Sequence, residues 1–323
     1  MAAAVSQGHY ATALKCFDTL SAEEQKTQQA LYLAGFCWKR RHDVQKAKTY
    51  LKATVESGFE GYPGWQTASE ILQDIATIEK IAPPFNRDVP DQVSAKLHVF
   101  AKPTDWSSQI LKELPAFVVR ARECFGNDIP TINLYIIEKR EDYEKFFRLI
   151  FQNEPRTWQD GTGDANIFVF CEQNREHKTV LPISRAVANN LHEYGHSLCN
   201  TIFGDDYLKL VPHWFDEGVA DMVAAPYNKQ LFDYSEKCLA DKNGIGRVKP
   251  TYEQLSKNMY ATPDSGYMYS RLMVKEMLKG QPDSTLRKIL EQARELRDFD
   301  KAIKEVTGIS PPDLLQRVIA KYN

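Results

Sequence analysis

The residues best suited to chemistry lie in one short segment, His192-Glu193-Tyr194-Gly195-His196. Residues four apart lie above one another on a helix, so His192 and His196 point in the same direction. Their imidazole nitrogens can then bind one metal ion, and His-Glu-x-x-His on a helix is the sequence form of a zinc site. Glu193 lies one step around the helix, where a general base for a zinc-bound water belongs. The segment therefore predicts a zinc site.

A solvated helix that happens to carry two histidines is the alternative interpretation. The apolar residues around the segment follow helical periodicity and favour a partly buried helix: Val187, Leu191 and Leu198. Ser184 is expected to cap the start of this helix. Gly195 costs about 1 kcal/mol in a helix interior relative to alanine, which predicts close approach of backbone or substrate there. Cys199 could compete for the metal, but a thiol in the core is the favoured interpretation.

A catalytic zinc site needs a third protein ligand and an open position for water. The segment Pro212–Asp221 supplies the candidate. Glu217 and Asp221 are four residues apart and share a helix face, so Glu217 can bind the zinc while Asp221 accepts the free N–H of a ligand histidine. The alternative is an ordinary amphipathic helix whose first turn is acidic. Three ligands with an open position predict one catalytic zinc ion per chain.

Together these motifs resemble the gluzincin metallopeptidases. His-Glu-x-x-His followed by Trp-x-x-Glu-Gly-x-Ala is similar to peptidase MA-like domains, which are often joined to tetratricopeptide repeats. Matched by position, the resemblance makes His192, His196 and Glu217 the zinc ligands. It makes Glu193 the general base, and Asp221 the acid behind a ligand.

The resemblance extends over residues 93–323 and implies further roles. Gly266–Ser270 resembles the family's Tyr-x-x-Ser segment at the start of a helix. Tyr267 is then the candidate donor to the developing oxyanion, with Tyr269 as the second choice. Tyrosines packed in the core are the alternative. His213 departs from the family's pattern, and a role for it on the substrate side is a hypothesis.

The activity implied is zinc-dependent hydrolysis of peptide bonds, in which a zinc-activated water attacks the scissile carbonyl and Glu193 moves the proton. An extended peptide is expected along an edge strand at 165–172, with the glycines at 161 and 163 allowing that rim to move. Three alternatives are a protease dedicated to one partner protein, a zinc hydrolase that acts on another bond, and a non-catalytic protein-interaction module on a peptidase-like fold. Because every catalytic position is filled, the last of these is disfavoured.

The sequence patterns around these residues predict an α+β chain of two domains. Residues 1–85 are expected to be helical, and three pairs of residues 34 positions apart match one another: Tyr10 with Val44, Ala13 with Ala47, and Phe17 with Leu51. This period resembles tetratricopeptide repeats, in which small and large residues alternate where helices pack. A generic helical hairpin is the alternative. Three prolines at 82–90 predict a linker.

Residues 93–323 are expected to form a zincin-type, thermolysin-like domain with a small mixed sheet and a helical C-terminal half. Its strands are predicted at 96–101, 131–137 and 165–172, with a turn at 161–164. Its helices are predicted at 106–125 with a kink at Pro115, at 140–151 and around the histidine segment, and then at 286–296, 299–306 and 314–322.

Composition excludes several classes of protein. A net charge of −2 without a basic cluster argues against nucleic acid as a partner, and no apolar run reaches the 18 or so residues that span a bilayer. The six scattered cysteines indicate reduced thiols. The expected partners are a peptide or protein substrate and a protein bound by the repeats. The compartment stays open: cytoplasmic if the chain is complete, secreted or periplasmic if it was cut from a longer one.

Overall fold

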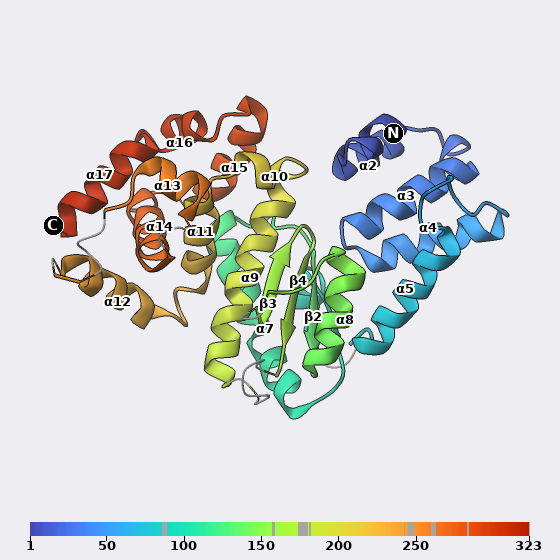
Figure 1. The fold of residues 1–323 in the computed structure, drawn as a ribbon, viewed down its shortest axis with the longest axis horizontal. Helices are drawn as coiled ribbons and strands as arrows, with labels where there is room; N and C mark the ends of the chain where they lie inside the picture. Colours follow the sequence, from blue (N-terminus) through green and yellow to red (C-terminus); the bar gives the residue numbers. More distant parts are fainter. Residues whose placement is uncertain are drawn as a thin grey trace. The chain divides into compact units, whose positions relative to one another are not determined.

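The computed structural model of the chain describes residues 1–85, 89–156, 159–173, 180, 182–241, 243–244, 249–259, 263–282 and 284–322. The described residues form a mixed α/β structure that is mostly helical and contains a four-stranded sheet (Figure 1). Contacts divide the chain into two compact units, Met1–Ser108 with Thr131–Leu181, and Gln109–Pro130 with Pro182–Asn323. These bounds differ from the predicted linker at 82–90, of which residues 86–88 lie outside the described residues.

The first unit begins with helices and continues into the sheet. Its helices are α1 (Ala2–Ser6), α2 (Tyr10–Asp18), the short 3-10 helix η1 (Glu24–Lys26), α3 (Gln28–Arg40), α4 (Val44–Glu56), α5 (Ala68–Ile81), α6 (Asp91–Ser94) and α8 (Arg140–Phe151). Local signals fix two of the starts. The Asp43 side chain accepts a hydrogen bond from the Lys46 amide at α4, and Thr67 and Glu70 form a capping box at α5.

The residues matched at a period of 34 lie where these helices pack. Ala13, Ala47 and Leu51 are fully buried, and Phe17 is nearly so. Gly35 explains how closely α3 and α4 approach, because a Cβ atom there would lie 2.6 Å from Cγ of Leu51. A residue without a side chain on α3 therefore lies directly against a large residue of α4.

The sheet has the strand order β1-β2-β4-β3, with β1 (Leu97–Ala101), β2 (Ile132–Ile137) and β4 (Ile167–Cys171) parallel and β3 (Gly161–Asp164) antiparallel to β4. Every residue of β2 and β4 is buried, as continuous apolar runs predict for central strands. Two predictions were wrong. Residues 161–164 form a strand rather than a turn. The strand predicted at 165–172 was expected at an edge of the sheet, but it lies inside the sheet because β3 pairs with it on one side and β2 on the other.

One hydrophobic core serves both the N-terminal helices and the sheet. It includes Ile75, Ile78 and Ile81 of α5 together with Tyr135 and Ile137 of β2. Rings from the sheet and α8 are stacked or tilted against one another within it: Phe100, Tyr135 and Phe146. The helical region and the sheet are therefore parts of one packed structure.

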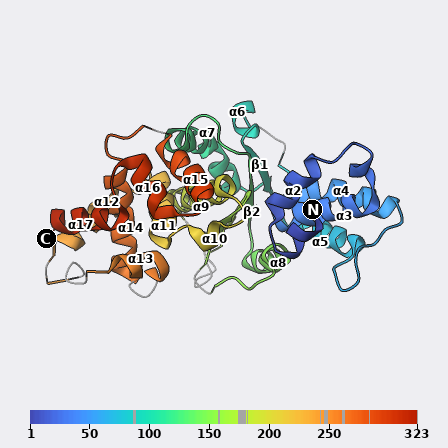
Figure 2. The ribbon, with the colours of Figure 1, turned by 90° about the horizontal axis from the view of Figure 1, so that it is seen from above.

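Within its described residues, the regular secondary structure of the second unit is helical. It holds most of α7 (Asp105–Phe125, which contains Pro115), and then α9 (Ile183–Phe203), α10 (Tyr207–Leu210), α11 (His213–Ala224), α12 (Lys229–Ala240), α13 (Tyr252–Lys257), α14 (Pro263–Met277), α15 (Thr285–Leu296), α16 (Phe299–Thr307) and α17 (Pro311–Tyr322). The helical C-terminal part expected from the sequence is confirmed. Figures 1 and 2 show α11 between α9 and α14, and it packs extensively on both.

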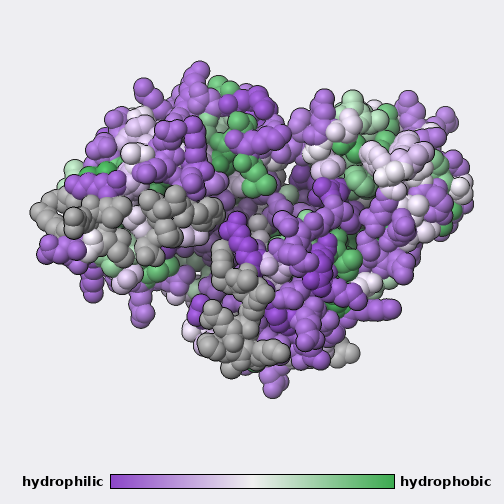
Figure 3. Space-filling view, in the orientation of Figure 1, coloured by the Kyte–Doolittle hydropathy of each residue, from purple (hydrophilic) through white to green (hydrophobic). Residues whose placement is uncertain are grey.

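The surface drawn in Figure 3 is mostly hydrophilic, with apolar side chains in separate small patches. Within the described part of the chain, none of the helices is long and apolar enough to cross a membrane. The six cysteines are all free thiols, as the sequence predicted.

Candidate metal centre

Helix α9 carries the two histidines. Its buried residues recur with helical periodicity on both sides of the segment, and they include Val187, Leu191 and Leu198. The helix begins after Pro182, whose φ of −55° suits a helix start, so Ser184 lies inside the first turn and does not cap it as predicted. His192 and His196 remain partly exposed, with 21% and 12% of their side-chain surface open.

Helix α11 reaches the histidines because Gly195 has no side chain. A Cβ atom at Gly195 would lie 2.8 Å from Cα of Ala220, closer than real Cβ contacts. The close approach expected at this glycine is therefore an approach of backbone to backbone. Ala220 lies one turn from Glu217 on α11, so the same contact brings the Glu217 carboxylate beside the two imidazoles.

His192, His196 and Glu217 converge on one point. The two Nε2 atoms lie 3.1 Å apart, and Glu217 Oε2 lies 3.4 Å from Nε2 of His192 and 3.7 Å from Nε2 of His196. Ligand atoms about 2.0–2.1 Å from a tetrahedral zinc ion lie about 3.3–3.4 Å from one another. The three separations match these edges to within a few tenths of an ångström. Two imidazoles and a carboxylate are also ligand types that zinc takes.

Each histidine is held at its other nitrogen by a carboxylate. Nδ1 of His192 lies 3.1 Å from Asp221 Oδ1, and Nδ1 of His196 lies 2.6 Å from Asp216 Oδ1. An ionised carboxylate only accepts hydrogen bonds, so both Nδ1 atoms donate and both Nε2 atoms face the point of convergence, where each would present a lone pair in the neutral form. Asp221 therefore contacts a histidine as the sequence predicted, and Asp216 makes the corresponding contact with the second histidine.

The carboxylates around the cluster attract positive charge. Burial lowers the pKa of His192, but hydrogen bonds to Asp221 and Glu217 outweigh it and raise the pKa to about 10. Burial likewise lowers the pKa of His196, and the charge of Asp216 and its hydrogen bond raise it well above its usual range. Burial raises the pKa of Glu217, whereas both histidines hold it well below its ordinary value. A divalent cation would satisfy the same demand for positive charge.

Of the remaining predicted residues, Glu193 lies on α9, and two tyrosines lie on α14, which packs on α11. Glu193 is half-buried and leaves α9 about 100° around the helix from His192. Tyr267 is half-buried on α14, one turn before Arg271 and on the same helix face, whereas Tyr269 is 1% exposed. Tyr269 is therefore a core residue, and Tyr267 is the more exposed of the two tyrosines.

Two further predicted residues fall outside the cluster. His213 is the first residue of α11 and is half-buried. Cys199 is fully buried on α9, and burial raises the pKa of its thiol well above the usual range. A thiol held in its protonated form is a poor metal ligand, so the interpretation of Cys199 as a core residue is the one that fits.

Four residues of the site were missed from the sequence: Tyr207, Asp216, Ser235 and Arg271. The Tyr207 hydroxyl donates a short hydrogen bond to Asp216, Arg271 contacts Asp221, and Ser235 contacts Arg271. Asp216 had a local signal, since it is an acid next to the ligand Glu217 in the first turn of α11. Tyr207, Ser235 and Arg271 had none, because their contacts depend on how separate helices pack.

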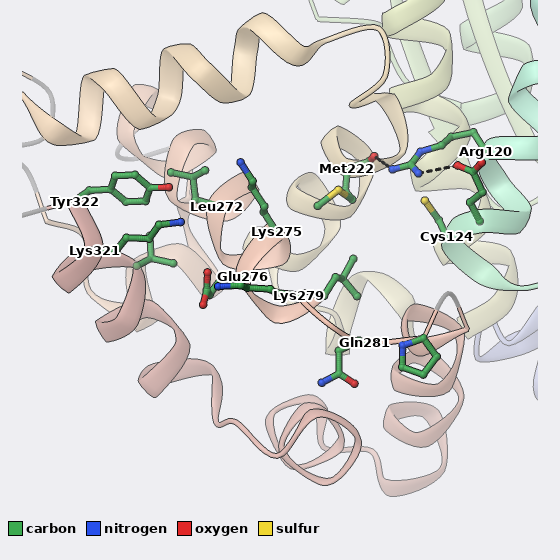
Figure 4. Close-up of a pocket in the computed structure, with 14 residues that line it drawn as sticks. Arg120, Cys124, Met222, Leu272, Lys275, Glu276, Lys279, Gln281, Lys321 and Tyr322 are labelled. Carbon is green, nitrogen blue, oxygen red and sulfur yellow. Dashed lines mark hydrogen bonds and ion pairs between the residues drawn. The ribbon is translucent and has the colours of Figure 1, made fainter.

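A pocket of about 420 Å³ lies elsewhere in the second unit, among α7, α11, α14 and α17 (Figure 4). Its lining combines apolar residues such as Met222 and Leu272 with charged ones such as Lys275, Glu276 and Lys321. The three cluster residues do not line it. Arg120 of α7 donates to the Met222 carbonyl oxygen at 2.7 Å and so links α7 to α11 at one side of the pocket.

Comparison of the chain with known protein families found no family that matches, and comparison with curated proteins found no match either.

Proposed function

We propose that this protein is a zinc-dependent peptide-bond hydrolase of the gluzincin type. The observation that carries the proposal is the convergence of His192 Nε2, His196 Nε2 and Glu217 Oε2 at the spacing of a tetrahedral zinc site. Three protein ligands leave a fourth position for water or substrate, which is the arrangement of catalytic rather than structural zinc. The zincin-type fold of residues 93–323 and the tetratricopeptide character of residues 1–85 belong to the same proposal.

Bound zinc would supply Lewis acidity, which lowers the pKa of water and polarises a carbonyl group. The protein's own residues do the rest. Glu193 takes the proton of the attacking water and passes it to the leaving amine. Asp221 and Asp216 hold the imidazoles in the tautomer whose Nε2 lone pair faces the metal. Tyr267 donates a hydrogen bond to the oxygen on which negative charge develops.

Metal content and one isosteric variant test the proposal. Purified protein should retain about one zinc ion per chain after desalting. Glu193→Gln should retain zinc and lose hydrolysis of a peptide library, because the amide cannot accept the proton. Glu253→Gln serves as the control, since Glu253 is on α13 with 76% of its side chain exposed. A chain without zinc, or a Glu193→Gln variant as active as the unchanged protein, would contradict the proposal.

A further inference from the structure

Arg271 is a buried cation whose hydrogen bonds lead to the candidate metal centre. It lies on α14 with 4% of its surface exposed. Its Nε and Nη2 atoms donate to the same oxygen, Asp221 Oδ2, at 3.0 and 2.7 Å. Its Nη1 atom lies 2.5 Å from the Ser235 hydroxyl oxygen, and that hydroxyl donates to the Leu231 carbonyl oxygen on α12. The guanidinium is therefore fixed from two helices.

The Asp221 carboxylate divides its oxygens between two partners. Oδ2 accepts from Arg271, and Oδ1 accepts from His192 Nδ1 at 3.1 Å. A single carboxylate thus joins the guanidinium to a candidate metal ligand. Rotation of the carboxylate about its Cβ–Cγ bond would break both contacts, so the two Arg271 N–H groups that converge on Oδ2 help to hold Oδ1 in place for His192.

The backbone is arranged to allow this contact. A Cβ atom at Gly218 would lie 2.4 Å from the Ser270 carbonyl oxygen, so only glycine lets α14 come this close to α11. Ser270 precedes Arg271, and Gly218 follows Glu217. The close packing of α11 and α14 therefore places Arg271 beside Asp221, one turn of α11 from the candidate ligand Glu217.

We propose that Arg271 is a positioning residue for the metal centre: it fixes the Asp221 carboxylate so that His192 presents Nε2 to the metal. This inference rests on the proposed function. A buried carboxylate without a cation is costly, and it would rotate or draw compensating charge from its neighbours. With Arg271 as its counter-charge, Asp221 is an acceptor of fixed direction, and it holds the His192 ring by Nδ1.

A purely structural ion pair is the competing explanation, and Arg140 provides a matched control. Arg140 is also buried, with 7% of its surface exposed, and it contacts Glu144 at 3.0 Å and Asp160 at 3.4 Å in the first unit. Both arginines hold separate segments together through carboxylates. Their replacement should therefore lower stability alike, whereas only Arg271 should affect the metal.

Zinc affinity of the full-length protein, measured by competition with a chromophoric chelator, is the deciding readout. Coulomb's law alone predicts that removing a cation near a bound dication strengthens binding. We expect the opposite for Arg271→Met, a loss of about tenfold or more, of the size seen when a partner behind a ligand is removed. Arg271→Lys keeps the charge but loses the planar fork, so it should also bind zinc more weakly. With Co²⁺ in place of zinc, both variants should show an altered visible absorption spectrum.

The outcomes separate the possibilities. Unchanged or tighter zinc binding and an unchanged Co²⁺ spectrum in Arg271→Met would overturn the inference, and so would an equal loss of affinity in Arg140→Met. If Arg271→Met does not fold, Arg271→Lys decides alone, because unchanged zinc affinity and an unchanged spectrum there would exclude a positioning role. If the unchanged protein binds no zinc, the metal centre itself fails and the inference fails with it.

Discussion

A Cβ atom on Gly195 would lie 2.8 Å from the Cα atom of Ala220, and this contact fixes the distance between α9 and α11. The neighbour is backbone and cannot rotate away. Gly195→Ala should therefore force the helices apart, with a cost of about 1–3 kcal/mol in unfolding free energy. Because Glu217 lies on the displaced helix, zinc affinity should fall as well. Chemical denaturation and chelator competition measure the two effects.

Gly35→Ala is the matched control for this prediction. The new methyl group would meet Cγ of Leu51 at 2.6 Å in the first unit, whereas the cluster residues belong to the second. This variant should lose stability while zinc affinity stays unchanged. If Gly195→Ala lowered stability alone, the position of Glu217 would not depend on the contact between the two helices.

Asp216 gives the second prediction. It accepts from His196 Nδ1 at 2.6 Å and from the Tyr207 hydroxyl. Asp216→Ala should weaken zinc binding by about 10–100-fold, since the partner that orients a ligand imidazole is lost. Tyr207→Phe keeps the contact to His196 and should weaken binding less. Isothermal titration with zinc would measure both, and equal affinities for all three proteins would contradict the role of Asp216.

The sequence predicted the part of this site that depends on local geometry. His192 and His196 are one turn apart, as are Glu217 and Asp221, and helical periodicity alone places each pair on one face. Asp216 was missed because it lies on a different face of α11 from Glu217, and its contact depends on how α11 crosses α9. Arg271 was missed for the same reason, since no spacing in the chain relates it to Asp221.

In the fold too, features set by local sequence were predicted better than features set by packing between distant segments. The β-rich runs at 131–137 and 165–172 predicted strands, although the second was expected at an edge and lies inside the sheet. Helix α8 was predicted with the observed bounds of Arg140–Phe151. The strand β3 was missed because glycines occupy two of its four positions, so it carries no alternating pattern. The turn lies instead at Ala165 and Asn166, where Asn166 has a φ of +62°.

His42 gives a prediction for pH. It is 7% exposed and has a φ of +63°, and its Nδ1 atom lies 3.3 Å from the Ala165 carbonyl oxygen and 3.9 Å from Asp164. Burial lowers the pKa of His42 below its ordinary value of 6.5. The Asp164 charge and the bond to the Ala165 carbonyl oppose this, and Arg40 and Arg41 reinforce it.

Between the lowered pKa and 6.5, the unfolded chain binds a proton at His42 that the folded chain does not. Stability should therefore rise with pH across this window and decrease as the pH falls below 6.5. His42→Asn tolerates the positive φ and does not titrate, so the difference in melting temperature from the unchanged protein should depend on pH. A difference in melting temperature that stays constant from pH 5 to 8 would contradict the lowered pKa of His42.

Removal of residues 1–85 tests whether the N-terminal helices form a separate domain. The sequence predicts a boundary near the prolines at 82–90, and on that basis residues 93–323 should fold alone. The shared core argues otherwise, because Ile75, Ile78 and Ile81 of α5 pack in one cluster with Tyr135 of β2 and Phe146 of α8. Each large apolar side chain left exposed costs about 1.5–3 kcal/mol, and the loss of several exceeds a typical margin of stability.

We therefore expect the chain that starts at residue 86 to lose the ordered packing of its sheet. Amide hydrogen exchange of β2 and β4 measures this directly, and protection there should fall to that of an open segment. The variant Ile78→Ala in the full chain is the graded control, with an expected cost of about 2–5 kcal/mol. Full protection of both strands in the shortened chain would show that the helices contribute no essential part of the core. In that case the boundary predicted from the prolines is the better description of the domains.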